Sequence, residues 1–251
     1  MAELITVDGR YLSGEDRFGD WKVTSLEGWW DTPDRKGRDV EIELADGSYD
    51  LEEAYEQRLV TIEGRVKSKN HDMQHEAMNW LNGALSRSSG EIVVAGHGQT
   101  QHARVKLAGS TRWTTVTDRY AKFQMRLKCP DPRKFGEVRT FVARVNAPAG
   151  IQHFGNYPAT PFMRVTGNAP GGYRITLGGY SVQVNRELGS SYPHEIDYWT
   201  GRLRVNDKFV TGDMSSAVFA PVDPGQRDTL SIVALTSGSP VVTMTLPDTF
   251  I

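Results

Sequence analysis

The chain has 251 residues, of which 29 are Lys or Arg and 31 are Asp or Glu, so its formal net charge is −2. This balance argues against a protein whose whole surface binds nucleic acid or anionic lipid, because such a surface needs many uncompensated positive charges. The single cysteine, Cys129, excludes an intrachain disulfide and a zinc site built from several cysteines. No stretch approaches the roughly 18 apolar residues that cross a bilayer, and the first residues lack the pattern of a signal peptide. We therefore expect a globular protein that folds in a reducing cytoplasm, without membrane insertion.

Charged residues are distributed unevenly along the chain. Residues 1–145 hold 22 Lys or Arg and 23 Asp or Glu, whereas residues 146–251 hold 7 and 8. The charge density therefore falls from about 31% to about 14%, although each part has a net charge of −1. The change lies near Asn146–Gly150, a segment with Pro and Gly that is typical of linkers. The sequence thus predicts two domains, 1–145 and 146–251.

The first part is predicted to consist mostly of strands. Apolar and polar residues alternate, as in half-buried strands, at Val40–Leu44, Ala103–Leu107 and Phe123–Cys129. Further strand-like segments are Ile5–Val7, Leu59–Val66 and Phe141–Val145.

A single helix is predicted over residues 72–87. Its apolar side chains form one stripe at helical spacing, which consists of Met73, Ala77, Trp80, Leu81, Ala84 and Leu85. Asn70 or Asp72 can cap the start of this helix, and Gly90 follows its end.

The second part has the pattern of an all-β domain. Short apolar runs alternate with turn signals such as Gly178-Gly179 and Asn206-Asp207, and strands spaced by about 8–12 residues are typical of a β-sandwich. These runs are Phe162–Val165, Tyr173–Leu177, Tyr180–Val184, Glu195–Tyr198, Arg202–Val205, Leu230–Ala234 and Val241–Leu246. The predicted fold class is mainly β, with an N-terminal β-sandwich or split-barrel-like domain that carries one α-helix, and a C-terminal β-sandwich.

The sequence carries no motif that predicts catalysis or a cofactor. His71 and His75 have the spacing of a zinc pair on a helix, but the zincin order requires Glu directly after the first His, where Asp72 stands. A solvated helix face is therefore the favoured interpretation. Cys129 ends an alternating strand, so we interpret it as a small buried thiol rather than a nucleophile. No P-loop, dinucleotide-binding or nucleophile-elbow motif occurs, and we expect no enzymatic activity, metal or cofactor.

Aromatic and basic residues suggest places of contact. Trp29 and Trp30 lie in a polar loop, where they anchor either the core or an interface, and the sequence favours neither interpretation. Arg35 and Lys36 belong to a mixed-charge cluster that we interpret as a solvated loop, with a subunit contact as the alternative. Trp199 precedes a turn and is costly to expose. The candidate interface or peripheral-contact residues are Trp29, Trp30, Arg35, Lys36, Arg133, Lys134 and Trp199.

Residues 123–136, with the sequence Phe-Gln-Met-Arg-Leu-Lys-Cys-Pro-Asp-Pro-Arg-Lys-Phe-Gly, resemble the end of the N-terminal domain of siphophage distal tail proteins. Members of that family often end a strand there with the element that Asp131–Gly136 presents here. The preceding order is similar too, with strands at Gly37–Val40 and Arg58–Gly64 and then a single helix that ends in Leu-Asn-Gly-Ala-Leu. The second half resembles the galectin-like sandwich of the family, and the resemblance covers nearly the whole chain in order.

The resemblance implies a structural protein without catalytic residues or cofactors. Family members form a ring, usually a hexamer, at the distal end of a phage tail tube. The N-terminal domains build the ring around a channel, and the galectin-like domains project outward. The implied partners are further copies of the chain, the tail tube protein, and a tail-tip hub or fibre protein, while DNA only passes through the channel. The implied location is the virion tail tip, after assembly in the bacterial host cytoplasm.

The alternative is a carbohydrate-binding module for adhesion to the host surface, suggested by the sandwich and its aromatic residues. Galectins that bind sugar present a His-x-Asn-Pro-Arg strand and a Trp followed two residues later by Glu. The segments that begin at His153 and at Trp199 match neither pattern. Lectin activity is therefore disfavoured, and Trp199 or Tyr192 is left as a peripheral sugar contact.

Overall fold

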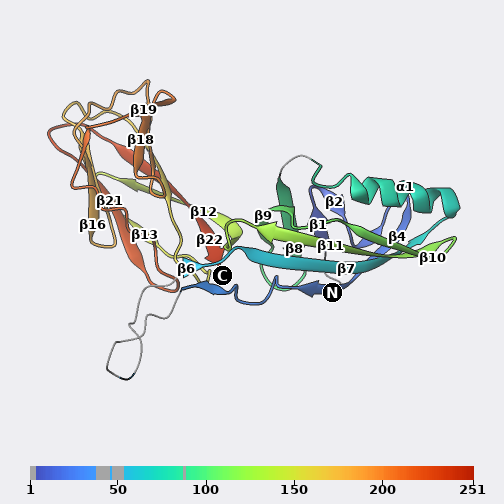
Figure 1. The fold of residues 1–251 in the computed structure, drawn as a ribbon. Coiled ribbons are helices and arrows are strands. Elements are labelled where there is room, and N and C mark those ends of the chain that lie inside the picture. The colour runs from blue at the N-terminus through green and yellow to red at the C-terminus, as the bar shows by residue number, and fades with distance from the viewer. Residues whose placement is uncertain (1–3, 38–45, 47–53, 87–88) are drawn as a thin grey trace. The chain divides into compact units, whose positions relative to one another are not determined.

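The computed structural model describes residues 4–37, 46, 54–86 and 89–251 (Figure 1). The predicted strand at Val40–Leu44 lies outside these residues, as does most of the predicted Gly37–Val40 strand. The chain forms two compact units, one comprising Met1–Lys134 with Ile251 and the other Phe135–Phe250.

The two units divide after Lys134 rather than after residue 145. Strand β12 (Lys134–Arg144) is continuous and pairs in the second unit with β22 (Val241–Phe250). The predicted linker is a turn in the second unit, where Asn146 has φ +62° and the backbones of Arg144 and Ala147 bond to each other. The change in charge density thus marks a change of composition within the second unit.

The first unit is built on the strand order β2-β1-β8-β9-β11-β7-β4-β3, with β10 on β11. Its strands are β1 (Leu4–Val7), β2 (Arg10–Tyr11), β3 (Gly14–Glu15), β4 (Gly19–Glu27), β7 (Arg58–Ser68), β8 (Gly90–Ala95), β9 (Gln101–Leu107), β10 (Arg112–Thr117) and β11 (Tyr120–Cys129). A separate pair joins β5 (Arg35–Lys36) to β6 (Ala54–Tyr55). The core follows from the period of two, because Val60 and Ile62 of β7 stand opposite Leu127 and Met125 of β11, and all four are buried.

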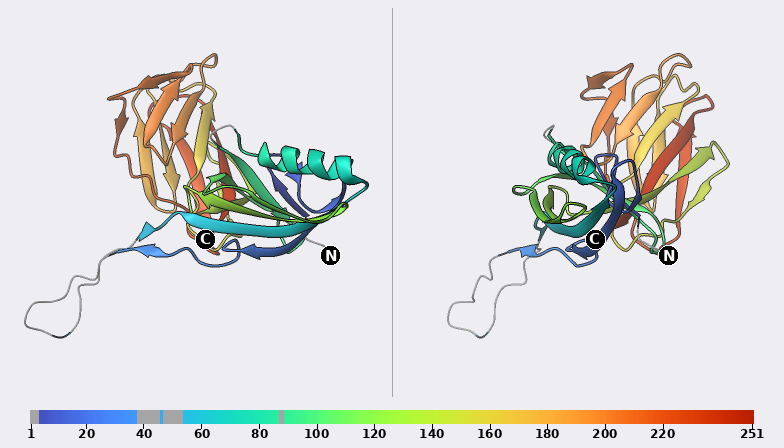
Figure 2. Two further views of the ribbon diagram at one scale, coloured as in Figure 1. Left: turned by 45° about the vertical axis from the view of Figure 1, so that its right-hand side comes forward. Right: turned by 90° about the vertical axis from the view of Figure 1, so that its right-hand side faces the viewer.

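Helix α1 (His71–Asn82) lies along the buried face of this sheet (Figure 2). Asn70 caps its start, since its side-chain oxygen accepts the backbone N–H of Met73 at 2.8 Å. The predicted end at Arg87 is wrong, because the helix ends at Asn82 and Gly83 occupies its C-cap. Ala84 and Leu85 are buried although they follow the helix. Their apolar character therefore made the predicted helix longer than the observed one.

The second unit is a sandwich of two sheets. One has the order β19-β18-β17-β14-β22-β12 and the other β13-β21-β15-β16-β20. The remaining strands are β13 (Ala149–Ile151), β14 (Phe162–Thr166), β15 (Tyr173–Leu177), β16 (Tyr180–Val184), β17 (His194–Asp197), β18 (Arg202–Val205), β19 (Lys208–Val210), β20 (Met214–Ser215) and β21 (Asp228–Ala234). The predicted fold class, mainly β with one α-helix among the described residues, is confirmed. Within the described part of the chain, no helix has both the length and the apolar character needed to cross a membrane.

Candidate functional site

The first unit holds a cluster of buried cations beside Trp29. Arg58, the first residue of β7, is only 1% exposed. Its Nη1 donates to the carbonyl oxygens of Gly28 at 2.8 Å, Trp29 at 3.2 Å and Asp31 at 2.5 Å. Its Nε donates to the carbonyl oxygen of Pro132 at 3.0 Å. One guanidinium thus fixes the tryptophan loop to the segment that precedes β12.

Lys134 joins this cluster from the start of β12. Its Nζ donates to the carbonyl oxygen of Trp29 at 2.9 Å and lies 5.5 Å and 5.4 Å from the ring centroids of Trp29 and Trp30. Aromatic faces attract a cation at such distances. Burial is the main reason why the pKa of Lys134 is lowered to about 8, and the neighbouring Arg58 charge lowers it further.

The tryptophan loop turns at Gly28, which has φ +78°. A Cβ at this position would lie 1.9 Å from the carbonyl oxygen of Leu59, so only glycine fits without a backbone shift. The Gly28 N–H donates to the carboxylate of Asp31 at 3.0 Å, which closes the turn.

The structure separates the two tryptophans that the sequence could not distinguish. Trp29 is fully buried and Lys134 is 3% exposed, so neither offers side-chain surface to a partner. Trp30 is 45% exposed and meets the His97 ring edge-on, with centroids 6.0 Å apart. Trp29 and Lys134 therefore act inside the unit, and the contact role of Trp30 stays a prediction.

The other basic candidates of the first unit make different contacts. Arg35 and Lys36 form the exposed strand β5, and Arg35 lies over the Tyr55 ring at 5.3 Å. Arg133 is held by the carboxylate of Asp131, with Nη2 and Oδ2 2.7 Å apart. This contact gives the Asp-Pro-Arg element a local structural role.

Cys129 is buried beneath the same cluster, as predicted. Burial raises the pKa of its thiol to about 11, with the Arg58 charge opposing that rise. The thiolate is therefore scarce at neutral pH, which is unsuited to nucleophilic chemistry.

Replacing Lys134 with methionine is expected to remove a pH dependence of the first unit. Between about pH 8 and 10.5 the unfolded chain binds more protons at Lys134 than the folded chain does, so this residue makes stability rise with pH. The Cys129 thiol acts in the opposite direction from pH 9 to about 11, and burial, the main cause of its raised pKa, is present in both proteins. Urea denaturation should show the wild type gaining on the order of 2–3 kcal/mol relative to Lys134→Met across this window. A difference that does not change with pH would contradict this assignment.

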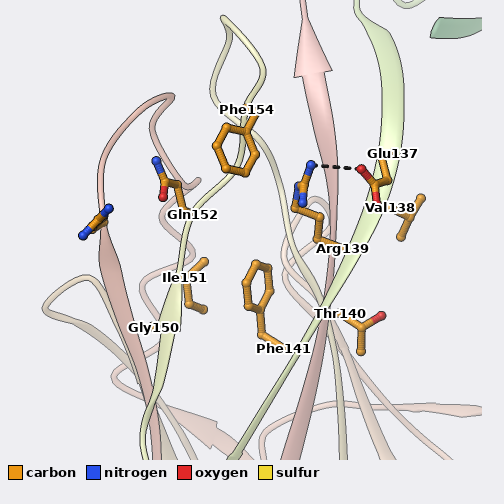
Figure 3. Close-up of a pocket in the computed structure, with 10 residues that line it drawn as sticks. Glu137, Val138, Arg139, Thr140, Phe141, Gly150, Ile151, Gln152 and Phe154 are labelled. Atoms are coloured by element: carbon orange, nitrogen blue, oxygen red, sulfur yellow. Dashed lines mark hydrogen bonds and ion pairs between the residues drawn. The ribbon is translucent and has the colours of Figure 1, made fainter. Parts of the chain in front are cut away.

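The second unit contains an open groove of about 620 Å³ (Figure 3). Arg139 points into it, with its guanidinium 4.4 Å from the ring centroid of Phe154. Arg139 Nη2 donates to Asp248 at 3.1 Å and to Glu137 at 3.0 Å, and these bonds raise its pKa, chiefly through Asp248. Asp248 is fully buried and also accepts the backbone N–H of Phe154 at 2.8 Å. Its carboxylate thus joins the Arg139 side chain to the backbone at Phe154.

The two aromatic residues that the sequence offers as peripheral contacts, Trp199 and Tyr192, are both exposed. Trp199, 68% exposed, follows β17, and its backbone N–H donates to Asp197 at 2.9 Å. Tyr192, 53% exposed, lines a separate pocket with Arg186 and His194. The predicted peripheral contact at Trp199 stays a prediction.

The two helical histidines lie together at the start of α1. The Nε2 atoms of His71 and His75 are 3.2 Å apart and both side chains are exposed. In the described part of the chain, no group of three or more His, Cys, Asp or Glu side chains is arranged to hold a metal ion.

Arg58, in the cluster of buried cations beside Trp29, was not among the site residues predicted from the sequence. It was predicted only as the start of a strand, because its hydrogen bonds reach residues 27 to 74 positions away. The one local signal was a charged residue at a position that the alternation of β7 assigns to the buried face.

Comparison of the sequence with protein-family models and with curated proteins gives no match. Among solved structures, the Dit protein of phage SPP1 is similar with a TM-score of 0.78 and 15% identity, over 100% of both chains. It is described as a paradigm of the hub adsorption apparatus in phages that infect Gram-positive bacteria. Two structures of the phage p2 baseplate in its activated conformation, with Ca and with Sr, each align at a TM-score of 0.49 and 7% identity, over 97% of this chain and 98% of theirs. The chain therefore has the fold of SPP1 Dit over its whole length, as the resemblance to siphophage distal tail proteins predicts.

Proposed function

We propose that the chain is a non-catalytic structural protein of a phage tail tip, which assembles with copies of itself into a hexameric ring. The observation that carries this proposal is the similarity to SPP1 Dit, which covers 100% of both chains and thus both units of this one. The family resemblance at Asp131–Gly136 supports it from the sequence.

In this proposal the first unit builds the ring around a channel, and the second unit faces the surroundings as a galectin-like domain. The ring joins the tail tube protein to a tail-tip hub or fibre protein and lets DNA pass. Assembly takes place in the host cytoplasm and the mature location is the virion. Exposed Trp30, Arg35 and Lys36 of the first unit are the candidate contact residues, since their side chains are accessible in the isolated chain.

Light scattering on the purified full chain tests the ring. A hexamer has a mass of about 168 kDa, six times the 28.0 kDa of one chain. A mass of 28.0 kDa at every concentration up to the solubility limit would contradict the proposal.

The second candidate function is a carbohydrate-binding module, and the exposure of Trp199 and Tyr192 is the observation that favours it. Sugar rings stack on exposed aromatic side chains, which explains why such residues are common in sugar sites. A glycan array probed with the full chain separates the two proposals: binding that Trp199→Ala abolishes would favour the module, whereas the ring requires no sugar.

A further inference from the structure

The outward face of the sheet in the first unit is strongly basic. Along β4, β7, β10 and β11, one set of side chains faces the core beneath α1 and the alternate set faces outward. The outward set holds seven cations and three carboxylates, Asp20, Glu27 and Glu63, in a chain whose net charge is −2. We call this surface the basic face; its cations are Lys22, Arg65, Lys67, Arg112, Lys122, Arg126 and Lys128.

The strand register places like charges directly opposite one another. Arg65 of β7 stands opposite Lys22 of β4 on one side and Lys122 of β11 on the other, which makes a row of three cations. Like charges in directly opposed positions destabilise a sheet. Among the residues that the structure describes, no ion pair joins any of the seven cations to a carboxylate. The row of three cations is therefore expected to lower the stability of the sheet.

The basic face is hollowed where its charge is densest. A depression of about 380 Å³ is lined by Arg65, Arg112 and Lys122, together with Thr24 and Thr114. Its one carboxylate, Glu63, already accepts a hydrogen bond from the side chain of Gln124 at 2.6 Å. A depression lined by three cations suits a phosphate group.

We propose that the basic face contacts the phosphodiester backbone of double-stranded DNA without sequence preference. Phosphates are contacted by Lys, Arg, Ser, Thr, Gln and Tyr side chains, and these types make up most of the face. Protein interfaces instead need apolar or aromatic anchors and are depleted in Lys. The face is rich in Lys, and the large exposed apolar side chains of its strands, Leu59 of β7 and Val116 of β10, lie singly. The composition therefore favours DNA over an acidic protein.

This inference deepens the proposed function. It rests on that function for one point, which is that DNA passes through the ring. Sequence-independent phosphate contacts are weak, with dissociation constants of about 10⁻⁴–10⁻⁶ M at physiological salt, and they let a protein slide along the duplex. Such contacts would guide DNA through a channel without holding it.

Fluorescence anisotropy with the full chain and a short labelled duplex tests the basic face. Wild type should bind two duplexes of unrelated sequence equally at about 50 mM NaCl and lose most of its affinity by about 200 mM. The variant Lys22→Gln, Arg65→Gln, Lys122→Gln should bind about tenfold more weakly and lower the salt slope by about 2–3. The matched control Arg144→Gln, Lys208→Gln, Arg227→Gln changes the net charge equally on exposed positions of the second unit and should bind like wild type.

Three results would overturn this inference: no DNA binding by wild type at low salt, an equal loss of affinity in the control, or a face that binds polyglutamate but not DNA. A melting temperature of the triple variant at or above that of wild type, expected because the repulsive row is removed, shows that lost binding is not lost folding. Light scattering on the same samples reports ring formation separately. A chain that forms rings without binding DNA would contradict this inference alone. A chain that binds DNA but never forms a ring would contradict only the proposed function.

Discussion

Replacing Arg58 with methionine is expected to lower the free energy of unfolding of the first unit by about 3–5 kcal/mol. Methionine fills much of the same volume but cannot donate hydrogen bonds. The carbonyl oxygens of Gly28, Asp31 and Pro132 then lose the bonds that Arg58 provides, and a buried acceptor without a partner costs about 1–3 kcal/mol. Loss of a buried charge offsets part of this cost, because the desolvation that lowers the pKa of Arg58 also disappears.

Urea denaturation followed by tryptophan fluorescence measures this loss, and Arg126→Met is the matched control. Arg126 lies on the outward face of β11 and is exposed, so its replacement should change stability by less than about 0.5 kcal/mol. A loss at Arg58 no larger than at Arg126 would show that the carbonyl cluster does not hold the tryptophan loop.

Truncating Leu81 to alanine is expected to destabilise the first unit by about 2–5 kcal/mol. Leu81 is fully buried in the core between α1 and the sheet, and its removal leaves a cavity. Trp80→Ala should fall in the same range, because the Trp80 ring lies 5.5 Å from both Phe18 and Trp21.

Glu76→Ala is the control for both helix variants, since Glu76 is exposed on α1. Thermal unfolding should leave this control near wild type and lower the melting temperature of Leu81→Ala. Equal melting temperatures for Leu81→Ala and wild type would mean that the apolar stripe of α1 does not face a core.

The strands were predictable where their pattern is local. Strands β15, β16 and β18 begin and end at the predicted residues, because alternation and flanking turns mark both ends. Strand β4 was missed, since its one-residue bulge between Val23 and Ser25 interrupts the period of two. The helix end was misplaced because burial of Leu85 depends on tertiary packing rather than on helical geometry.

The candidate site was only partly predictable. Trp29 and Trp30 are adjacent and identical in type, and only tertiary packing distinguishes the buried Trp29 from Trp30, which is 45% exposed. The basic face was present in the sequence as the charged positions of β11, at Lys122, Arg126 and Lys128. That these cations share one surface with cations of β4 and β7 became clear only from the strand register.

Negative-stain electron microscopy of the purified full chain tests the central claim most directly. The account predicts closed rings with an open channel, and six-fold class averages. Particles that remain single two-unit molecules at high protein concentration, with no rings, would contradict it.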